Sequence, residues 1–100
     1  MKQTIKLVAF ASLAVADMSN ALAYSGERYA KDAKITIDEA RKIALKAFPG
    51  TVVEEELEHK TGGSGLRYSF DIRSSKHETH EVGIDAKDGT VLQNGKDNDE

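Results

Sequence analysis

The chain has 100 residues, of which 39% are hydrophobic and 31% are charged, with a formal net charge of −3 and no cysteine. This size suits one small soluble domain and excludes a second one. Without cysteine, the chain is neither a disulfide-stapled scaffold nor a lipoprotein acylated on cysteine. A mildly acidic composition without a basic stripe argues against nucleic acid or an anionic membrane as the partner.

The first 23 residues have the pattern of a signal peptide. Lys2 and Lys6 precede an apolar run from Leu7 to Ala16, and Ala21-Leu22-Ala23 gives the small-x-small pattern of a cleavage site. The alternative is an uncleaved anchor, but a membrane-spanning helix needs about twenty apolar residues and this run is much shorter. We therefore expect a protein exported to the periplasm or the extracellular space, with no membrane span after cleavage.

A helix is predicted after a flexible lead-in, residues 24–34, which shows no sustained hydrophobic period. Thr36 is placed to cap the free amide groups while Glu39 reaches back to complete a capping box. Pro49 and Gly50 end the helix. Its apolar side is expected to face a sheet, and consists of Ile37, Ala40, Ile43, Ala44, Ala47 and Phe48.

After Gly50 the hydrophobic period changes to two, which predicts an antiparallel meander of three to four strands. The expected strands are residues 51–60, 66–73, 78–85 and 90–93. With the amphipathic helix packed on one face of this sheet, the fold class is α+β and the domain spans residues 35–93. Residues 94–100 are too polar to bury a side chain and are predicted to form a disordered acidic tail.

The second strand sets the expected register, because its residues alternate strictly between Leu66, Tyr68, Phe70, Ile72 and Arg67, Ser69, Asp71, Arg73. Keeping the apolar residues on one face pairs Leu57 with Tyr68 and Val53 with Ile72. The same register places Glu58 opposite Arg67 on the solvated face. It also points Glu55 inward, which leaves an open sheet edge or a bulge as alternatives for that residue.

The stretch GIDAKDGTVL, residues 83–92, is either a metal loop or a turn. An EF-hand loop needs oxygen ligands at positions one, three and five and glycine at position six. Starting the loop at Asp85 puts Lys87 at position three, and placing Gly89 sixth puts Ile84 first, so neither register fits. A hairpin turn needs only an Asp that bonds amides ahead of it and a Gly with positive φ, which Asp85 and Gly89 provide.

No other motif predicts catalysis or a cofactor. Gly62-Gly63-Ser64-Gly65 lacks the second glycine of a nucleophile elbow and the lysine of a P-loop, so it is expected to be a flexible hairpin loop. His77 and His80 diverge in a turn and a strand, and His59 lies near the other end of the sheet, so exposed imidazoles are expected rather than a zinc site. A triad of Ser69 or Ser75 with His80 and Asp71 lacks a supporting elbow. We expect no enzyme, metal or cofactor.

Four glutamates in the first strand, Glu54, Glu55, Glu56 and Glu58, are the strongest charge feature. The favoured interpretation is a solvated face, paired with Arg67 and Arg73, that protects a sheet edge from aggregation. The alternative is an acidic strip that meets a basic partner.

In order and spacing, three segments resemble the PepSY domain: ITIDEARKIALKAFPGTVVE, LRYSFDIR and GIDAKDGTVLQ. The resemblance covers roughly residues 35 to 93. It implies one helix against an antiparallel sheet. It also implies a regulator or inhibitor of peptidases, because the family occurs in propeptides of secreted thermolysin-like metallopeptidases and as small exported proteins. The motif residues, for which structural roles are expected, are Thr36, Glu39, Pro49, Gly50, Tyr68, Asp85 and Gly89.

We therefore expect an exported, non-catalytic module that binds a protein, with an exported peptidase as the first candidate. An exposed sheet edge can occlude a substrate cleft or accept an added strand through backbone bonds that leave no sequence motif. The candidate contact residues are Glu54, Glu56, Gly62, Gly63, Ser64 and Gly65. The alternative is a ligand- or metal-sensing or interaction module of the cell envelope unrelated to peptidases. The sequence does not indicate an oligomeric state.

Overall fold

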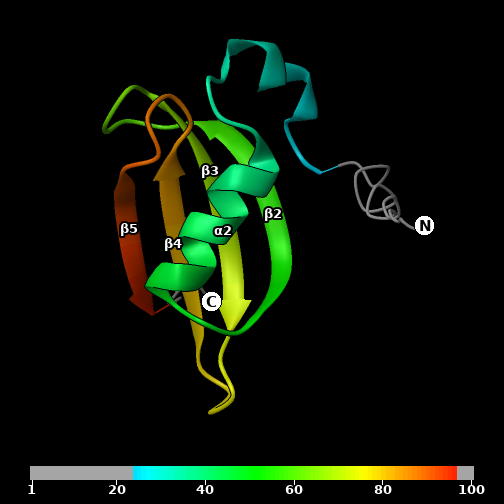
Figure 1. The fold of residues 1–100 in the computed structure, drawn as a ribbon, viewed down its shortest axis with the longest axis vertical. Coiled ribbons are helices and arrows are strands. Elements are labelled where there is room, and N and C mark those ends of the chain that lie inside the picture. The colour runs from blue at the N-terminus through cyan, green and yellow to red at the C-terminus, as the bar shows by residue number, and fades with distance from the viewer. Residues whose placement is uncertain (1–23, 97–100) are drawn as a thin grey trace, which may run out of the picture.

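The computed structural model describes residues 24–96. The predicted signal peptide and the last four residues of the predicted tail lie outside this range. The described chain contains one 3-10 helix, one α-helix and four strands, which are η2 (Glu27–Asp32), α2 (Ile37–Ala47), β2 (Thr51–His59), β3 (Leu66–Arg73), β4 (Thr79–Asp85) and β5 (Val91–Lys96). The strands form one antiparallel sheet in the order β2-β3-β4-β5, and α2 crosses one face of it (Figure 1). This is the predicted α+β fold.

The helix α2 begins with the predicted capping box. The backbone N–H of Glu39 donates to the hydroxyl of Thr36 at 3.1 Å, and the N–H of Thr36 donates to the carboxylate of Glu39 at 2.9 Å. The helix ends at Ala47, two residues before Pro49. Ala40 and Ala44 are fully buried against the sheet, so the helix approaches it closely. Ala47, which was expected on the same face, is exposed at the last turn.

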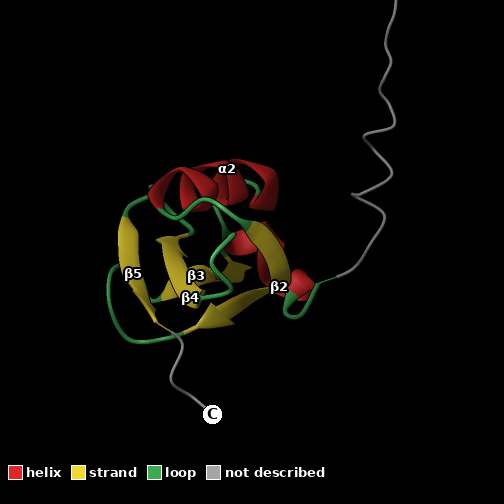
Figure 2. Cartoon of the chain, turned by 90° about the horizontal axis from the view of Figure 1, so that it is seen from below, coloured by secondary structure: helices red, strands yellow, loops and turns green. Residues whose placement is uncertain are grey.

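The core lies between α2 and the inner face of the sheet. Figure 2 shows α2 lying over that face. The predicted inward residues of β3 are all buried, with Phe70 and Ile72 at 0% exposure. Each such side chain stabilises the fold by about 1.5–3 kcal/mol relative to an exposed position. The largest fully buried side chains of the described residues are Tyr68, Phe70, Leu57, Ile72, Ile84 and Val82.

The register between β2 and β3 agrees with the prediction at one end and differs at the other. Leu57 pairs with Tyr68 and Glu58 pairs with Arg67, as expected. The predicted pairing of Val53 with Ile72 is wrong, because a bulge between Val52 and Glu54 inserts one residue into β2. Val52 therefore pairs with Ile72, and Val53 is 56% exposed.

The outer face of the sheet is less solvated than expected. Arg67 and Ser69, which were predicted to be solvent-exposed, are each only 6% exposed. The guanidinium of Arg67 donates to the side-chain oxygen of Gln93 at 3.2 Å and to the carbonyl of Thr61 at 3.1 Å. The side chain lies flat across the sheet because Gly83, beneath it, has no side chain to lift it. The aliphatic part of an arginine covers apolar surface in this way while its head finds hydrogen bonds.

The lead-in, residues 24–34, is more structured than predicted. It contains η2, and the side chains of Tyr24, Tyr29 and Ala33 pack against the core. The backbone N–H of Leu57 donates to the carbonyl of Ser25 at 2.8 Å, so this segment also attaches to the edge of β2. Two tyrosines bury enough apolar surface to order a short segment that has no regular period.

The predicted tail also begins too early, because β5 continues to Lys96. Asn94 pairs with Val82 and Lys96 pairs with His80 across the β4–β5 ladder. Backbone ladder bonds do not require apolar side chains, so polarity alone did not reveal this end of the strand.

The stretch at residues 83–92 is a turn. Lys87 N–H donates to the Asp85 carboxylate at 2.9 Å, and Gly89 N–H donates to the Asp85 carbonyl at 2.9 Å. Gly89 has φ of 80°, a conformation that favours glycine. Among residues 24–96, no group of three or more histidine or acidic side chains is placed to hold a metal ion.

Candidate functional site

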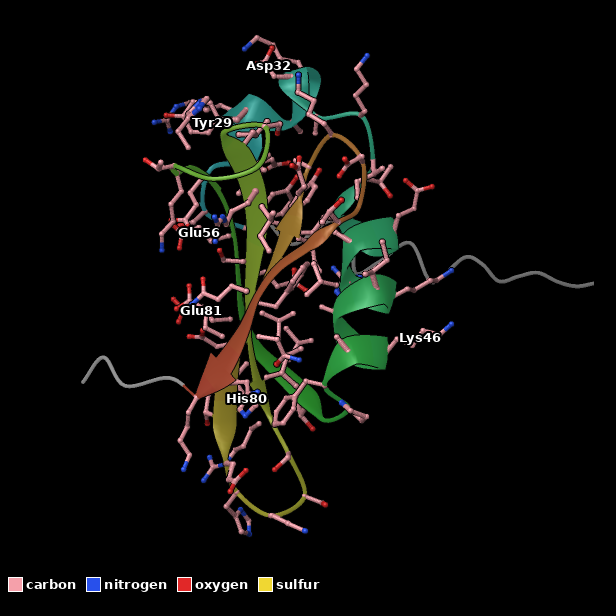
Figure 3. All side chains as sticks on the ribbon, turned by 90° about the vertical axis from the view of Figure 1, so that its left-hand side faces the viewer. Tyr29, Asp32, Lys46, Glu56, His80 and Glu81 are labelled. Atoms are coloured by element: carbon pink, nitrogen blue, oxygen red, sulfur yellow. The ribbon has the colours of Figure 1, made fainter. Side chains whose placement is uncertain are left out.

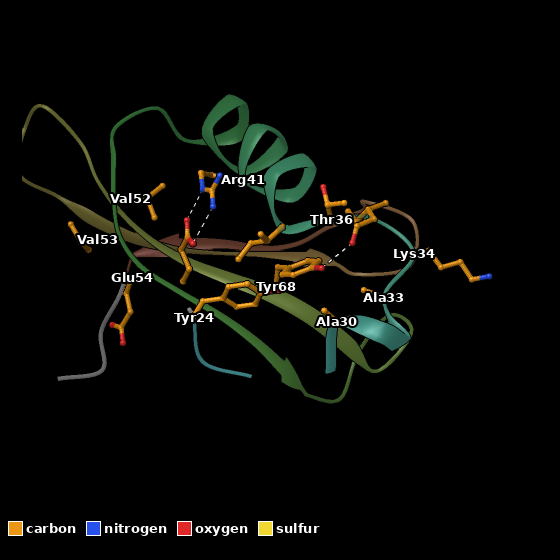
Figure 4. Close-up of a pocket in the computed structure, with 13 residues that line it drawn as sticks. Tyr24, Ala30, Ala33, Lys34, Thr36, Arg41, Val52, Val53, Glu54 and Tyr68 are labelled. Atoms are coloured by element: carbon orange, nitrogen blue, oxygen red, sulfur yellow. Dashed lines mark hydrogen bonds and ion pairs between the residues drawn. The ribbon is translucent and has the colours of Figure 1, made fainter. Parts of the chain in front are cut away.

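A groove lies beside β2, where the helix leaves the sheet uncovered. α2 packs on β3, β4 and β5, and the inner face next to β2 is closed only in part by the lead-in. The groove has a volume of about 840 Å³ and is shown in Figure 4. Its apolar lining includes Tyr24, Ala30, Ala33, Ile37, Val52 and Tyr68, and its charged rim consists of Lys34, Arg41, Glu54 and Glu55.

Two tyrosines from distant parts of the chain form the floor of the groove. The rings of Tyr24 and Tyr68 have centroids 6.5 Å apart and are tilted by 57°. The hydroxyl of Tyr68 donates to the carbonyl of Ile35 at 2.9 Å, which ties β3 to the start of α2 (Figure 4). Burial, together with the neighbouring Tyr24, raises the pKa of Tyr68 to about 12. The floor is therefore uncharged at physiological pH and suits an apolar ligand group.

An ion pair closes the groove on the helix side. Arg41 of α2 donates through Nε and Nη2 to both carboxylate oxygens of Glu55, the second at 3.1 Å. Arg41 also donates to Asp38 at 2.7 Å. The hydrogen bonds from Arg41 to Glu55 raise the pKa of Arg41, so the guanidinium stays charged. This contact explains the inward Glu55, which lies on the edge strand opposite Phe70 with its charge neutralised.

The outer edge of β2 is covered over only part of its length. Ser25 forms an isolated parallel bridge with Glu56. Gly26 lies so close that a Cβ there would meet the carbonyl oxygen of Leu57 at 1.8 Å, and its φ of 83° also favours glycine. Within the described residues, the edge from Thr51 to Glu55 has no strand beside it. The groove and an open strand edge are therefore adjacent.

The outer face beside this edge is acidic. Glu54, Glu56 and Glu58 alternate with inward residues along β2, and Glu81 follows two strands away. Partial burial and the nearby carboxylates of Glu58, Glu54 and Glu81 raise the pKa of Glu56. Figure 3 shows Glu56 and Glu81 on the side of the sheet opposite α2. We call these four glutamates the acidic face; like charges held this close favour a basic neighbour.

The loop Gly62–Gly65, expected to be flexible, is fixed through Ser64. Its N–H and hydroxyl donate to the carboxylate of Asp85 at 2.8 and 2.6 Å. Asp85 is 3% exposed, and these bonds with that from Lys87 lower its pKa although burial alone raises it. The sequence predicted Asp85 as a turn residue but gave no signal for this second partner. The loop contacts Asp85 instead of extending the surface of Glu54 and Glu56.

The three histidines lie in separate environments. His80 stacks on Phe48 with ring centroids 3.7 Å apart, and its Nδ1 lies 2.8 Å from the side-chain oxygen of Asn94. It is therefore half-buried, not exposed as predicted. His59 meets the edge of Tyr29, and His77 lies in the β3–β4 turn with φ of 66°.

The Ser-His-Asp combination that the sequence allows with Ser69 as the nucleophile is not assembled. Ser69 donates to Glu58 on the outer face at 2.7 Å. His80 pairs with Ile72 and stacks on Phe48, which places it on the opposite, helix-facing side of the sheet. These two side chains cannot exchange a proton across the sheet.

Comparison with protein families decides the relationship. The family model "Peptidase propeptide and YPEB domain", PepSY, matches residues 34–93. The chain belongs to the PepSY family. PepSY domains are associated with peptidase propeptides and with peptidase regulation, and are generally non-catalytic. No curated protein and no solved structure gives a significant match. Among the described residues of this PepSY domain, no helix has the length and apolar character needed to cross a membrane.

Most PepSY motif residues stabilise the fold. Thr36 and Glu39 start the helix, Pro49 follows its end, and Asp85 holds both the turn and the Ser64 loop. Tyr68 differs, because it packs in the core and also forms part of the groove floor. The groove residues that sequence reasoning missed, Tyr24, Arg41 and Val52, come from three segments that only the folded chain brings together.

Proposed function

We propose that this PepSY protein is an exported, non-catalytic module that regulates or inhibits a secreted or periplasmic peptidase. The observation that supports it most is the groove beside the open edge of β2, in a domain whose family is associated with peptidase propeptides. Its apolar floor and unpaired backbone suit a segment of polypeptide rather than a small polar metabolite.

Inhibition through this site requires no catalytic residue. A strand edge of the module, or a segment of the peptidase docked along it, places the domain across the substrate cleft and blocks access. Val53, displaced outward by the bulge and 56% exposed, adds an apolar contact at this edge. The contact is reversible, because the binding face is small and carries charge at its rim.

The test combines the purified full chain with exported peptidases of the same organism. We expect slower peptide hydrolysis and co-purification of one peptidase. A groove-filling variant, Ala30→Trp, should abolish both effects, since Ala30 is exposed and lines the groove. Val91→Trp adds the same bulk on β5, at the opposite edge of the sheet, and should leave both effects intact. Unchanged hydrolysis and no complex at roughly 50 µM, where even weak binding is visible, exclude the proposal.

A further inference from the structure

We infer that the groove and edge of β2 bind an extended peptide segment in which basic and apolar residues alternate. This names the chemistry of the partner at the proposed regulatory site and so rests on the proposed function. Two features of the described residues support it: the way in which Ser25 attaches to β2, and the contrast between the apolar groove on one side of that edge and the acidic face on the other.

The chain itself shows how a segment attaches to this edge. Ser25 lies beside β2 as a parallel neighbour, and its carbonyl accepts the N–H of Leu57 at 2.8 Å. Beyond this bridge, in the direction of Thr51, the edge has no neighbouring strand among the described residues. Because the bridge is parallel, Tyr24 continues this line toward Thr51, and an added segment lies beyond Tyr24 along the same edge. The bridge at Ser25 and the bulge at Val53 leave only a short part of this edge for regular pairing, so side-chain contacts must contribute much of the affinity.

The two sides of the β2 edge require different side chains from that segment. Neighbouring residues of a strand point to opposite faces of a sheet. Side chains pointing to the inner face enter the groove and meet Tyr24, Val52 and Tyr68, an apolar surface. Side chains pointing to the outer face lie next to Glu54 and Glu56 of the acidic face. Alternation of apolar and basic residues satisfies both sides at once.

Charge selects the basic residues for the outer side only. On the inner side, Arg41 already neutralises Glu55, so a second cation gains nothing there. On the outer side, partial burial and the nearby carboxylates raise the pKa of Glu56, and a lysine or arginine beside it offsets the repulsion between those carboxylates. Arg67 does not supply this charge, because its guanidinium donates hydrogen bonds to Gln93 and to the carbonyl of Thr61.

A second copy of this chain is a poor occupant of the same edge. Pairing β2 with β2 brings Glu54 and Glu56 of both copies together, and like charges across a ladder destabilise it. Sedimentation of the full chain alone should therefore show a monomer. A dimer that disappears in Ala30→Trp and persists in Val91→Trp would assign the groove and edge to self-association and overturn the inference.

The direct test measures binding of labelled synthetic octapeptides to the full chain by fluorescence anisotropy. The first peptide alternates lysine and leucine, the second alternates glutamate and leucine, and the third has the composition of the first in two blocks. We expect saturable binding of the first peptide alone. Equal binding of the alternating and block peptides would show charge attraction without strand alignment. No saturation of the first peptide up to roughly 1 mM would also overturn the inference.

Paired variants locate the site. Glu54→Lys/Glu56→Lys should reduce the affinity for the lysine–leucine peptide by at least about tenfold, because two ion pairs are lost and replaced by repulsion. The same variant should bind the glutamate–leucine peptide. The control Glu78→Lys changes the same kind of charge in the exposed β3–β4 turn and should alter affinity by less than about twofold. Ala30→Trp should abolish binding by filling the groove. Circular dichroism verifies that each variant is folded.

Backbone methylation of the ligand tests strand addition itself. Two lysine–leucine peptides are N-methylated, one at the lysines and the other at the leucines. An added strand turns alternate N–H groups toward β2, so one methylated peptide should lose binding and the other should keep it. Equal binding of the two would overturn the strand geometry. These peptide results do not depend on any peptidase, so binding without inhibition refutes the proposed function and leaves this inference standing.

Discussion

Glu55 of β2 lies opposite Phe70 on the helix-facing side of the sheet, where both of its carboxylate oxygens accept hydrogen bonds from Arg41 of α2. A charged group on the inner face of an edge strand is tolerated because a partner from another element meets it. The same contact forms one wall of the groove and joins the helix to the strand that it does not cover.

The Arg41–Glu55 pair should therefore contribute measurably to folding. Arg41→Ala and Glu55→Ala should each destabilise the domain. The double variant should lose less unfolding free energy than the sum of the losses in the two single variants. Paired hydrogen bonds in a half-buried site predict a coupling free energy of about 1 kcal/mol, above that of most exposed pairs. Urea unfolding of the four proteins measures it. A coupling energy near zero would show that water solvates both groups equally well.

The bulge in β2 predicts unequal effects of two adjacent valines. Val52 packs against the core opposite Ile72, so Val52→Ala should reduce the free energy of unfolding by about 1–2 kcal/mol. Val53 is 56% exposed, and Val53→Ala should change the free energy of unfolding by no more than about 0.5 kcal/mol. The comparison is made by chemical denaturation. A larger loss for Val53→Ala than for Val52→Ala would show that β2 pairs with β3 without a bulge.

The bonds from Ser64 and Lys87 to Asp85 should make the fold sensitive to acid. They hold the pKa of Asp85 below its ordinary value, so ionised Asp85 stabilises the folded state above the pKa that it has in the unfolded chain. That stabilisation is lost as the pH falls through the folded-state pKa. Asp85→Asn should destabilise the protein at neutral pH by about 2 kcal/mol and flatten the acid limb of the stability curve.

Ser64→Ala is the milder control for Asp85, because it removes the hydroxyl bond and keeps the backbone bond. It should cost about 1 kcal/mol at neutral pH. Thermal unfolding measured from pH 2 to 7 checks both variants. An acid limb unchanged in Asp85→Asn would assign the acid sensitivity to other carboxylates.

Glu56 should change the pH dependence of stability in the direction opposite to that of Asp85. Partial burial and its acidic neighbours raise its pKa, so Glu56 favours the folded state below its unfolded-state pKa and loses that contribution as pH rises through the folded-state value. Glu56→Gln should thus stabilise the protein at pH 7 by about 0.3 kcal/mol, a small value because the side chain is partly exposed. Added salt should shrink the gain. The comparison uses urea midpoints at pH 4 and 7, and a variant less stable than wild type at pH 7 would contradict it.

The parts of the fold that the sequence predicted have strong local signals. The capping box of Thr36 and Glu39 sets the start of α2, and the strict alternation of β3 sets which of its residues are buried. Pairing Leu57 with Tyr68 follows, because a slip by one residue would turn the apolar set to solvent. Asp85 and Gly89 indicate their turn through side-chain bonding and positive φ.

The remaining features depend on contacts between distant segments. Val52 and Val53 are chemically identical, so the sequence alone does not show which one the bulge excludes from the core. Glu55 has no local partner, and Arg41, 14 residues away in the sequence, meets it only once the helix has packed on the sheet. The groove was missed for the same reason: its floor joins Tyr24, in a segment without a period, to the central strand.

Because the bridge at Ser25 is isolated, the contacts along the two edges of β2 should open at different rates. β3 pairs with β2 from Thr51 to His59, whereas Ser25 meets it at a single position. Local opening of such a contact costs far less than global unfolding and occurs much more often. Each opening extends the vacant edge from Glu55 to Leu57, so the rate at which the proposed partner binds would depend on how often the Ser25 contact opens as well as on the affinity of the groove.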